Sequence, residues 1–165
     1  MALQSKMTVY VAVAGVLALM GGIVYYASLD NVELEQVEIE LTNVELRDVS
    51  IINNQAKFDV TFLIKNPSDK TFTVALIDYQ LYGDGIELGS GQYSTVDIAL
   101  PGRAVFYSGA EVPLKSTFVI NKSEVNEEVY ENLIENQIGN FSAEGVITTQ
   151  TSWSTTDKEF QTSIN

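Results

Sequence analysis

The sequence contains no cysteine and no histidine among its 165 residues. Without cysteine the chain forms no disulfides, so its fold depends on a hydrophobic core alone. The same two absences remove the usual zinc ligands and most pairs of a nucleophile and a base. We therefore expect no catalytic residues, no metal site and no cofactor, which indicates a protein that is not an enzyme.

Basic residues are also scarce. The chain has 9 Lys and Arg against 22 Asp and Glu, for a net charge of -13. Affinity for phosphate backbones requires clustered basic side chains, so the composition argues against nucleic acid as a partner. A solvated, acidic exterior is the simplest interpretation of this charge.

One long apolar segment stands out at the N-terminus. Residues 7–29, "MTVYVAVAGVLALMGGIVYYASL", carry no charge, and a helix of this length crosses a hydrocarbon core about 30 Å thick. Lys6 precedes the segment while Asp30 and Glu33 follow it, which keeps the N-terminus cytoplasmic. A cleaved signal peptide is the alternative, but Tyr25 and Tyr26 stand where small residues should precede the cleavage point. We expect a cytoplasmic stub and transmembrane anchor (1–29) and an extracytoplasmic domain (30–165), at the cell membrane in a single pass.

The rest of the chain alternates mostly with a period of two. Apolar residues recur at Phe58, Val60, Phe62 and Ile64, which is typical of a strand with one buried face. After residue 71 the alternation resumes and then slips by one position, which predicts a β-bulge near Leu76. Further strands are expected at 37–46, 96–100, 105–107, 112–120, 141–153 and 160–164, with turns at Asp84-Gly85, Pro101-Gly102 and 154–158. Such spacing predicts a mainly β, two-sheet antiparallel sandwich.

Two segments have helical periodicity. Leu34, Val37, Leu41 and Val44 fit a helix as well as a strand, but the β-branched content favours a strand there. Residues 121–139, "NKSEVNEEVYENLIENQIG", repeat apolar residues every four positions and predict one helix in the C-terminal half. Asn121 or Ser123 is the expected N-cap, and Gly139 the expected end. The apolar stripe comprises Val125, Val129, Tyr130, Leu133, Ile134 and Ile138.

Asn66-Pro67 interrupts the best strand pattern. Proline has no amide hydrogen and biases Asn66 toward an extended conformation, while Asn66, Ser68 and Asp69 can bond to the local backbone. We interpret this point as a structural corner. Proline in the middle of Asn-Pro-Ser excludes glycosylation at Asn66.

The same region resembles a known family. "FDVTFLIKNPSDKTFTVALIDYQLYGDGIELGSG" (58–91) and "LPGRAVFYSGAEVPL" (100–114) resemble the WHy (water stress and hypersensitive response) domain of type 2 late-embryogenesis-abundant proteins. The resemblance extends over nearly all of residues 36–165, and the apolar start is similar to that of membrane-anchored archaeal members. It implies an immunoglobulin-like or fibronectin-III-like β-sandwich and a link to desiccation or other stress. It implies structural roles for Asn66 and Pro67 and supplies no catalytic residues.

Three other groups of residues suggest chemistry. Asp78, Asp84 and Glu87 surround a predicted hairpin, but they lack the ordered loop of a calcium site. Lys115-Ser116 has the composition of a catalytic dyad, yet neighbours on a strand point to opposite faces. The tripeptides at Asn121 and Asn140 are N-glycosylation acceptor sequences in the predicted exterior.

Together these features predict a non-enzymatic, membrane-anchored envelope protein that protects the outer surface or binds partners there. The membrane is the expected partner, along with other envelope or membrane proteins. Two structural alternatives remain, namely a subunit of an envelope filament and an accessory subunit of a larger membrane complex. The sequence Ser5-Lys6-Met7 lacks the small residue of a pilin processing site, which counts against polymerising pilins.

Overall fold

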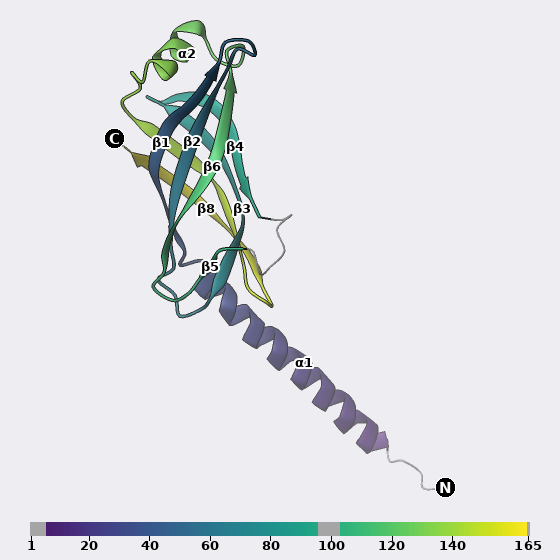
Figure 1. Ribbon diagram of the computed structural model, residues 1–165. Helices are drawn as coiled ribbons and strands as arrows, with labels where there is room; N and C mark the ends of the chain where they lie inside the picture. Colours follow the sequence, from purple (N-terminus) through teal and green to yellow (C-terminus); the bar gives the residue numbers. More distant parts are fainter. Residues whose placement is uncertain (1–5, 96–102, 165) are drawn as a thin grey trace.

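The computed structural model describes residues 6–95 and 103–164. A long helix leads into an elongated β body, and a short helix lies at the far end of that body (Figure 1). The elements are α1 (Lys6–Leu34), β1 (Glu38–Ser50), β2 (Gln55–Lys65), β3 (Phe72–Gly83), β4 (Ile86–Ser94), β5 (Val105–Phe106), β6 (Glu111–Asn121), α2 (Glu127–Ile134), β7 (Phe141–Gln150) and β8 (Thr155–Ile164).

The strands form two antiparallel sheets. One has the order β1-β2-β6, and the other has the order β4-β3-β7-β8 with β5 pairing to β3. The chain is therefore mainly β and antiparallel, with an apolar N-terminal helix and a short second helix. These features confirm the coarse fold expected from the sequence. The first strand also confirms the strand interpretation of residues 37–46, since only Leu34 of the alternative helix lies on α1.

Both sheets contribute to one hydrophobic core. Phe58, Val60, Phe62 and Ile64 of β2 are buried as predicted, because alternate side chains of a strand share one face. The Phe62 ring lies edge-on to Tyr79, with 4.9 Å between ring centroids, and edge-on to Phe160 at 5.8 Å. These contacts cross from β2 to β3 and β8, so aromatic packing holds the two sheets together.

The predicted bulge is confirmed. The register between β3 and β7 shifts between Val74 and Leu76, which leaves Ala75 as the extra residue. Val74, Ala75 and Ile77 are all buried, so the slip returns the second half of β3 to the core. Thr95 supplies hydrogen bonds to the carbonyl groups at the bulge. Its amide donates to the Ala75 carbonyl, and its hydroxyl donates to the Val74 carbonyl at 2.8 Å.

Hydrogen bonds connect the two sheets at both lateral edges. The Leu41 amide of β1 donates to the Thr162 hydroxyl of β8 at 2.9 Å. At the other edge the Ser116 hydroxyl of β6 donates to the Gln92 carbonyl of β4, also at 2.9 Å. The edge strands β1 and β4 therefore meet partners from the opposite sheet instead of only water.

The Asp84-Gly85 turn is confirmed, but the helix prediction was too long. Asp84 and Gly85 have φ of 49° and 81°, as a tight hairpin requires. Helix α2 covers only Glu127–Ile134, and its N-cap is Asn126 instead of Asn121 or Ser123. Asn126 is the N-cap because its side chain accepts a hydrogen bond from the Val129 amide at 2.8 Å.

The end of α2 and the last turn also differ from expectation. Asn136 has a φ of 57° and reverses the chain before Gly139, because residues 135–140 must return to the start of β7. The final turn lies at 151–154, since the Thr151 hydroxyl accepts from the amides of Trp153 and Ser154. The strand expected at 96–100 and the turn at Pro101-Gly102 lie outside the described residues.

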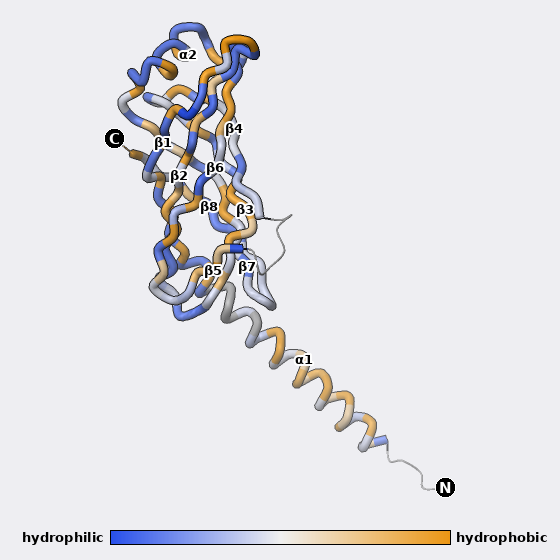
Figure 2. Tube along the Cα trace, viewed as in Figure 1, coloured by the Kyte–Doolittle hydropathy of each residue, from blue (hydrophilic) through white to orange (hydrophobic). Residues whose placement is uncertain are grey.

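Helix α1 combines an exposed apolar segment, which we call the rod (Lys6–Tyr26), with a C-terminal end that lies in the core. Its residues Lys6–Tyr26 form one apolar helix that is 0% buried and passes the length and hydropathy test for a membrane span, a test that a signal sequence also passes. Figure 2 shows this apolar character along the rod. The helix continues past the predicted residue 29 to Leu34, which is 0% exposed within the core of the body. The rod and the body therefore share a continuous stretch of helix.

A single glycine permits the close approach of β3 and β7. Gly145 pairs with Tyr79, and a Cβ there would collide with the Asp78 carbonyl oxygen and lie 2.8 Å from the Tyr79 Cα. We expect Gly145→Ala to lower the free energy of unfolding by about 3 kcal/mol, because only backbone movement relieves the collision. Urea unfolding of the full chain in detergent, followed by circular dichroism, measures the change.

The matched control is Gly139→Ala. The nearest atom to a Cβ at residue 139 is the Asp84 Oδ1 at 3.8 Å, which is ordinary contact. This variant should change the free energy of unfolding by less than about 0.5 kcal/mol. Equal urea midpoints for the two variants would show that the sheet tolerates a side chain at Gly145.

Candidate functional site

Three turns lie at the end of the body where α1 enters. They connect β2 to β3 (66–71), β5 to β6 (107–110) and β7 to β8 (151–154), and we call them the proximal turns. Figure 1 shows this end beside the last turns of α1, with α2 at the opposite, distal end. The Asn66-Pro67 corner belongs to the proximal end, so the family-like motif lies next to the candidate anchor.

Asn66 organises these turns through its side chain. Its Nδ2 donates to the carbonyl oxygens of Lys70 at 2.7 Å and Phe106 at 3.0 Å. Its Oδ1 accepts from the amide of Ser68 at 3.1 Å and from the hydroxyl of Ser68 at 2.8 Å. The side chain amide is thus fully used, within its own turn and across to the end of β5.

The backbone of Asn66 forms hydrogen bonds with the β5–β6 turn. Its amide donates to the Ala110 carbonyl at 2.9 Å, and its carbonyl accepts from the Gly109 amide at 2.8 Å. Gly109 has a φ of 73°, a conformation that other residues adopt at a cost. Asn66 is only 1% exposed, while Pro67 beside it is exposed and leads the chain away. One buried residue therefore holds two of the proximal turns in a fixed arrangement.

The proximal turns present aromatic side chains to solvent. Tyr107 is 66% exposed and Trp153 is 85% exposed. Both turns are held by backbone bonds, from Ala110 to Tyr107 at 2.9 Å and from Thr151 to Ser154 at 2.8 Å. Trp153 lies outside the strand predicted to end at residue 153, and its polar neighbours Thr151, Ser152 and Ser154 were the sequence signal for its exposure.

A contact joins the proximal turns to α1. The Lys70 ammonium lies over the ring of Tyr26, with 5.9 Å between the Nζ and the ring centroid. Such cation–π contacts contribute about 0.5–1 kcal/mol at exposed sites. Because Lys70 also accepts the Asn66 side chain through its carbonyl, the corner reaches the level of Tyr26 on the helix.

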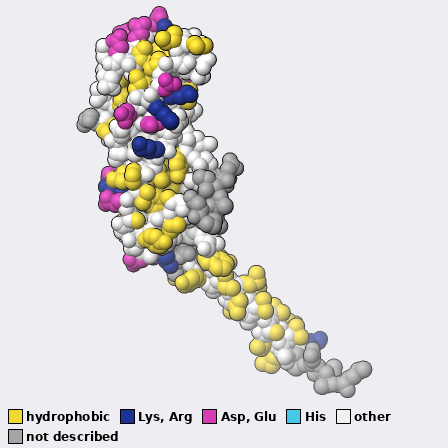
Figure 3. All heavy atoms as spheres, in the orientation of Figure 1, with side chains coloured by type: hydrophobic (Ala, Val, Ile, Leu, Met, Phe, Trp, Pro, Cys, Tyr) yellow, Lys and Arg dark blue, Asp and Glu magenta, His cyan; other side chains and the backbone are white. Residues whose placement is uncertain are grey.

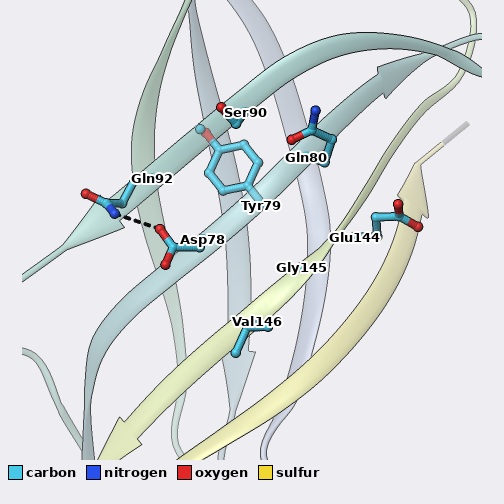
Figure 4. A pocket seen from close by; sticks show the side chains of 9 residues that line it. Asp78, Tyr79, Gln80, Ser90, Gln92, Glu144, Gly145 and Val146 are labelled. Carbon is cyan, nitrogen blue, oxygen red and sulfur yellow. Dashed lines mark hydrogen bonds between the residues drawn. The ribbon is translucent and has the colours of Figure 1, made fainter.

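A second candidate is a shallow depression on the outer face of β4, β3 and β7. It has a volume of about 700 Å³, and its lining includes Gly91, against which the buried Tyr79 ring packs, and Gly145. Figure 4 shows its polar lining, where the Gln92 amide donates to Asp78 at 2.7 Å. Glu144 likewise accepts from the Tyr82 hydroxyl at 2.6 Å. The polar groups are paired with each other, so the depression is a weak candidate for a ligand site.

The three carboxylates around the hairpin do not converge. Asp78 accepts from Gln92, Glu87 accepts from Gln80, and Asp84 accepts from the amides of Gly139 and Asn140. Across residues 6–95 and 103–164, no three Asp, Glu, His or Cys side chains are grouped to hold a metal ion. Asp84 instead fixes the start of β7 at the distal end.

Lys115 and Ser116 point to opposite faces. Ser116 is buried and Lys115 is exposed, as neighbours on β6 must be. The Ser116 hydroxyl accepts from the Tyr79 hydroxyl at 3.0 Å and donates to the Gln92 carbonyl. Burial raises the pKa of Tyr79 above its ordinary value, while its bond to Ser116 opposes that shift. Tyr79 is therefore neutral near pH 7, and this chain of hydroxyls links the sheets.

The two acceptor asparagines flank α2 at the distal end. Asn121 uses its side chain, because Nδ2 donates to Glu124 and Oδ1 accepts from Gln55, both at 2.8 Å. The Asn121 backbone amide and then its side chain lower the pKa of Glu124 below its ordinary value. Asn140 is exposed.

Comparisons with known proteins give only distant similarity. No protein-family model and no curated protein matches the chain. A protein from Archaeoglobus fulgidus has a TM-score of 0.46 at 12% identity, over 76% of this chain and 94% of its own. A protein from Arabidopsis thaliana has a TM-score of 0.46 at 14% identity, over 78% and 80%. A protein provisionally described as late embryogenesis abundant has a TM-score of 0.39 at 12% identity, over 98% of this chain and 88% of its own. With TM-scores below 0.5, these similarities carry no argument about family or function.

We expect Asn66→Ala to lower the free energy of unfolding by about 2–4 kcal/mol. The change removes the Asn66 partner of the Phe106 carbonyl and of the Ser68 amide, and it leaves the Lys70 carbonyl with the longer bond from the Ser68 hydroxyl at 3.4 Å. Buried polar groups without partners cost about 1–3 kcal/mol each. Urea unfolding of the full chain measures the loss. Asn53→Ala in the exposed distal turn is the control, with an expected change below about 0.5 kcal/mol. Similar losses in the two variants would contradict the role of Asn66.

Proposed function

We propose that the chain is a non-enzymatic, membrane-anchored protein of the type 2 late-embryogenesis-abundant (WHy) kind. In this proposal it protects the outer cell surface under stress or binds partners there. One observation carries the proposal, namely that α1 is fully exposed over its apolar length and yet ends inside the core at Leu34. The helix is thus continuous with the body, which supports an anchor over a cleaved leader.

Exposure of this helix to water would be unfavourable. Val16, Leu17 and Ile23 are each more than half exposed, and burying such a side chain contributes roughly 1.5–3 kcal/mol. A bilayer removes this apolar surface from water without any protein partner. Lys6 on one side and Glu33 and Glu35 on the other support an N-terminus in the cytoplasm and a body outside.

The arrangement of the sheets supports the finer fold proposal. The two sheets meet along both lateral edges and share their buried faces, as expected for an immunoglobulin-like or fibronectin-III-like sandwich. The resemblance of residues 58–91 to the WHy domain links this fold to stress. Asn66 and Pro67 are proposed to serve that domain as structural residues, which agrees with the buried hydrogen bonds of Asn66.

The absence of catalysis remains a proposal drawn from residue types. The sequence has no His and no Cys, which leaves carboxylates, serine and lysine as the available chemical groups. Among the described residues the carboxylates are dispersed and Lys115 points away from Ser116. These placements support a binding or protective role over hydrolysis.

One surface feature favours the second candidate, an accessory subunit of a larger membrane complex. Ile51 and Ile52 at the distal turn between β1 and β2 are 87% and 94% exposed. Adjacent exposed apolar residues on a protruding turn are typical of contact points with partners. Purification in mild detergent as a lone monomer would argue against this candidate. A filament subunit would be visible by electron microscopy of the purified chain.

A complementation experiment tests the leading proposal. Deleting the gene should lower survival after drying or osmotic shock, and the full chain should restore it. The double variant Val16→Arg/Leu19→Arg should fail to restore survival and should leave the carbonate-resistant membrane fraction, because each arginine at the helix centre costs roughly 2.5–3.5 kcal/mol. Val16→Leu/Leu19→Val is the control and should behave as the native chain. Unchanged survival after deletion would remove the stress role, independently of the anchor.

Glycosylation is proposed for the exposed asparagine first. Asn140 is exposed, whereas the Nδ2 of Asn121, which would carry the sugar, donates to Glu124. Peptide mass spectrometry of protein from the native organism should therefore find higher occupancy at Asn140 than at Asn121. Glu124→Gln weakens the acceptor of that bond and should narrow the difference, with Glu128→Gln as the control. Finding both asparagines unmodified would exclude the proposal.

A further inference from the structure

Two exposed aromatic residues at the proximal end have no role in the core. Trp153 and Tyr107 are 85% and 66% exposed, and neither belongs to the buried cluster or packs against it. Their turns are held by hydrogen bonds, through Thr151 for Trp153 and through Ala110 and the Asn66 corner for Tyr107. The fold therefore presents both rings to the surroundings in defined positions.

The covalent geometry of α1 fixes how far these turns lie from a bilayer. The apolar stretch Lys6–Tyr26 spans about 32 Å at 1.5 Å per residue, which matches a hydrocarbon core of about 30 Å. Tyr26 then lies at the edge of the hydrocarbon. The headgroup layer adds only about 5–8 Å on each side, and Leu34, already inside the body, lies roughly 12 Å beyond Tyr26 along the helix.

The proximal turns lie closer to the expected membrane than Leu34 does. Lys70 of the first turn lies 5.9 Å from the Tyr26 ring, so this turn is at the level of the expected hydrocarbon edge. Asn66 connects this turn to the turn that carries Tyr107. The β7–β8 turn lies at the same end of the body, beside α1 (Figure 1). A body in this position contacts the headgroups.

The proximal turns differ in charge from the distal segment around α2. The segments 66–71, 103–110 and 151–154 contain Lys70 and Arg103 against one carboxylate, Asp69. The distal segment 122–140 instead contains five glutamates and Lys122. Figure 3 shows acidic side chains gathered over α2, at the end away from α1. The acidic segment around α2 is thus held away from the lipid, where anionic headgroups would repel it. Residues 30–40, which join α1 to β1 at the proximal end, carry five carboxylates of their own, so charge does not drive the contact of this end with the membrane.

We propose that Trp153 and Tyr107 insert into the headgroup layer of the same bilayer that α1 spans. Trp and Tyr suit this layer, because the ring leaves water while its N–H or O–H stays hydrated. The helix and the two aromatic turns together give the body a fixed orientation on the membrane. Strand β1, with 13 residues at about 3.3 Å each, then places the Ile51-Ile52 turn roughly 40 Å away from the surface. This inference rests on the proposed membrane anchor.

The sole tryptophan of the chain makes the proposal directly testable. The full chain is reconstituted into phosphatidylcholine vesicles, with or without lipids brominated near the headgroup end of the acyl chain. Bromine quenches tryptophan at short range, so the Trp153 emission should fall in the brominated vesicles and lie at shorter wavelength than in urea-unfolded protein. Because the aromatic rings drive the contact, raising the salt concentration should leave the quenching unchanged.

Two variants place the single tryptophan elsewhere. Trp153→Phe/Tyr107→Trp should be quenched like the native chain. Trp153→Phe/Ile52→Trp is the matched control, with an equally exposed turn at the distal end, and it should not be quenched. Circular dichroism of each variant checks that the body keeps its fold. Quenching at residue 153 equal to that at residue 52, or quenching at residue 153 without quenching at residue 107, would overturn the proposal.

Flotation of the same vesicles separates this inference from the anchor. Protein that floats with the vesicles but shows no quenching at residue 153 leaves the anchor standing and overturns the docking of the turns. Protein that does not float overturns both. If Trp153 is shielded from acrylamide without bromine quenching, and the shielding grows with protein density, then a second copy of the chain covers the turns and the membrane does not.

Discussion

The buried amide of Asn66 is the constraint on which the proximal end depends. The two donors and the acceptor of its side chain join the first proximal turn to the end of β5, and its backbone amide and carbonyl bond to Ala110 and Gly109 before β6. A side chain without an amide would remove the buried donor to the Phe106 carbonyl, which is costly. The exposed rings of the proximal turns owe their fixed positions to this network and to the Thr151 turn. Rigidity at this end is therefore built from polar bonds, while the rest of the body relies on apolar packing.

Helix α1 couples the orientation of the rigid body to that of the apolar rod. Because the helix runs without interruption into Leu34, the orientation of the body follows the orientation of the rod. A flexible linker would let the body rotate freely above a membrane, but a continuous helix with the Lys70 contact to Tyr26 limits that rotation. In the proposed membrane orientation, the acidic distal end and the exposed Ile51-Ile52 turn are directed away from the lipid. This polarity suits a protein that meets either solutes or partners at a distance from the surface.

Local patterns predicted much of the body correctly. The phase slip near Leu76 predicted a bulge, and the structure has one at Ala75, because a period-two pattern must be restored for Ile77 and Tyr79 to be buried. The Asp84-Gly85 hairpin was also correct, since both residues tolerate positive φ. The helix boundaries were wrong because several residues of 121–139 have capping side chains. The Asn121 side chain bonds to Glu124 and Gln55, and Asn126 caps the helix instead. Trp153 was misplaced for a related reason, as its apolar character suggested a strand while Thr151 closes a turn around it.

The sequence by itself determined the apolar rod, the acidic charge, the absence of thiol and imidazole chemistry and the alternation that makes the body a β structure. These are properties of composition and of short-range spacing, which act wherever the chain is placed. Only the tertiary structure decided that Leu34 belongs to the core, that Asn66 reaches Phe106, and that Tyr107 and Trp153 emerge at the same end. Each of these facts joins residues far apart in the chain, and their proximity comes from the pairing of strands and the packing of two sheets, which no local pattern encodes.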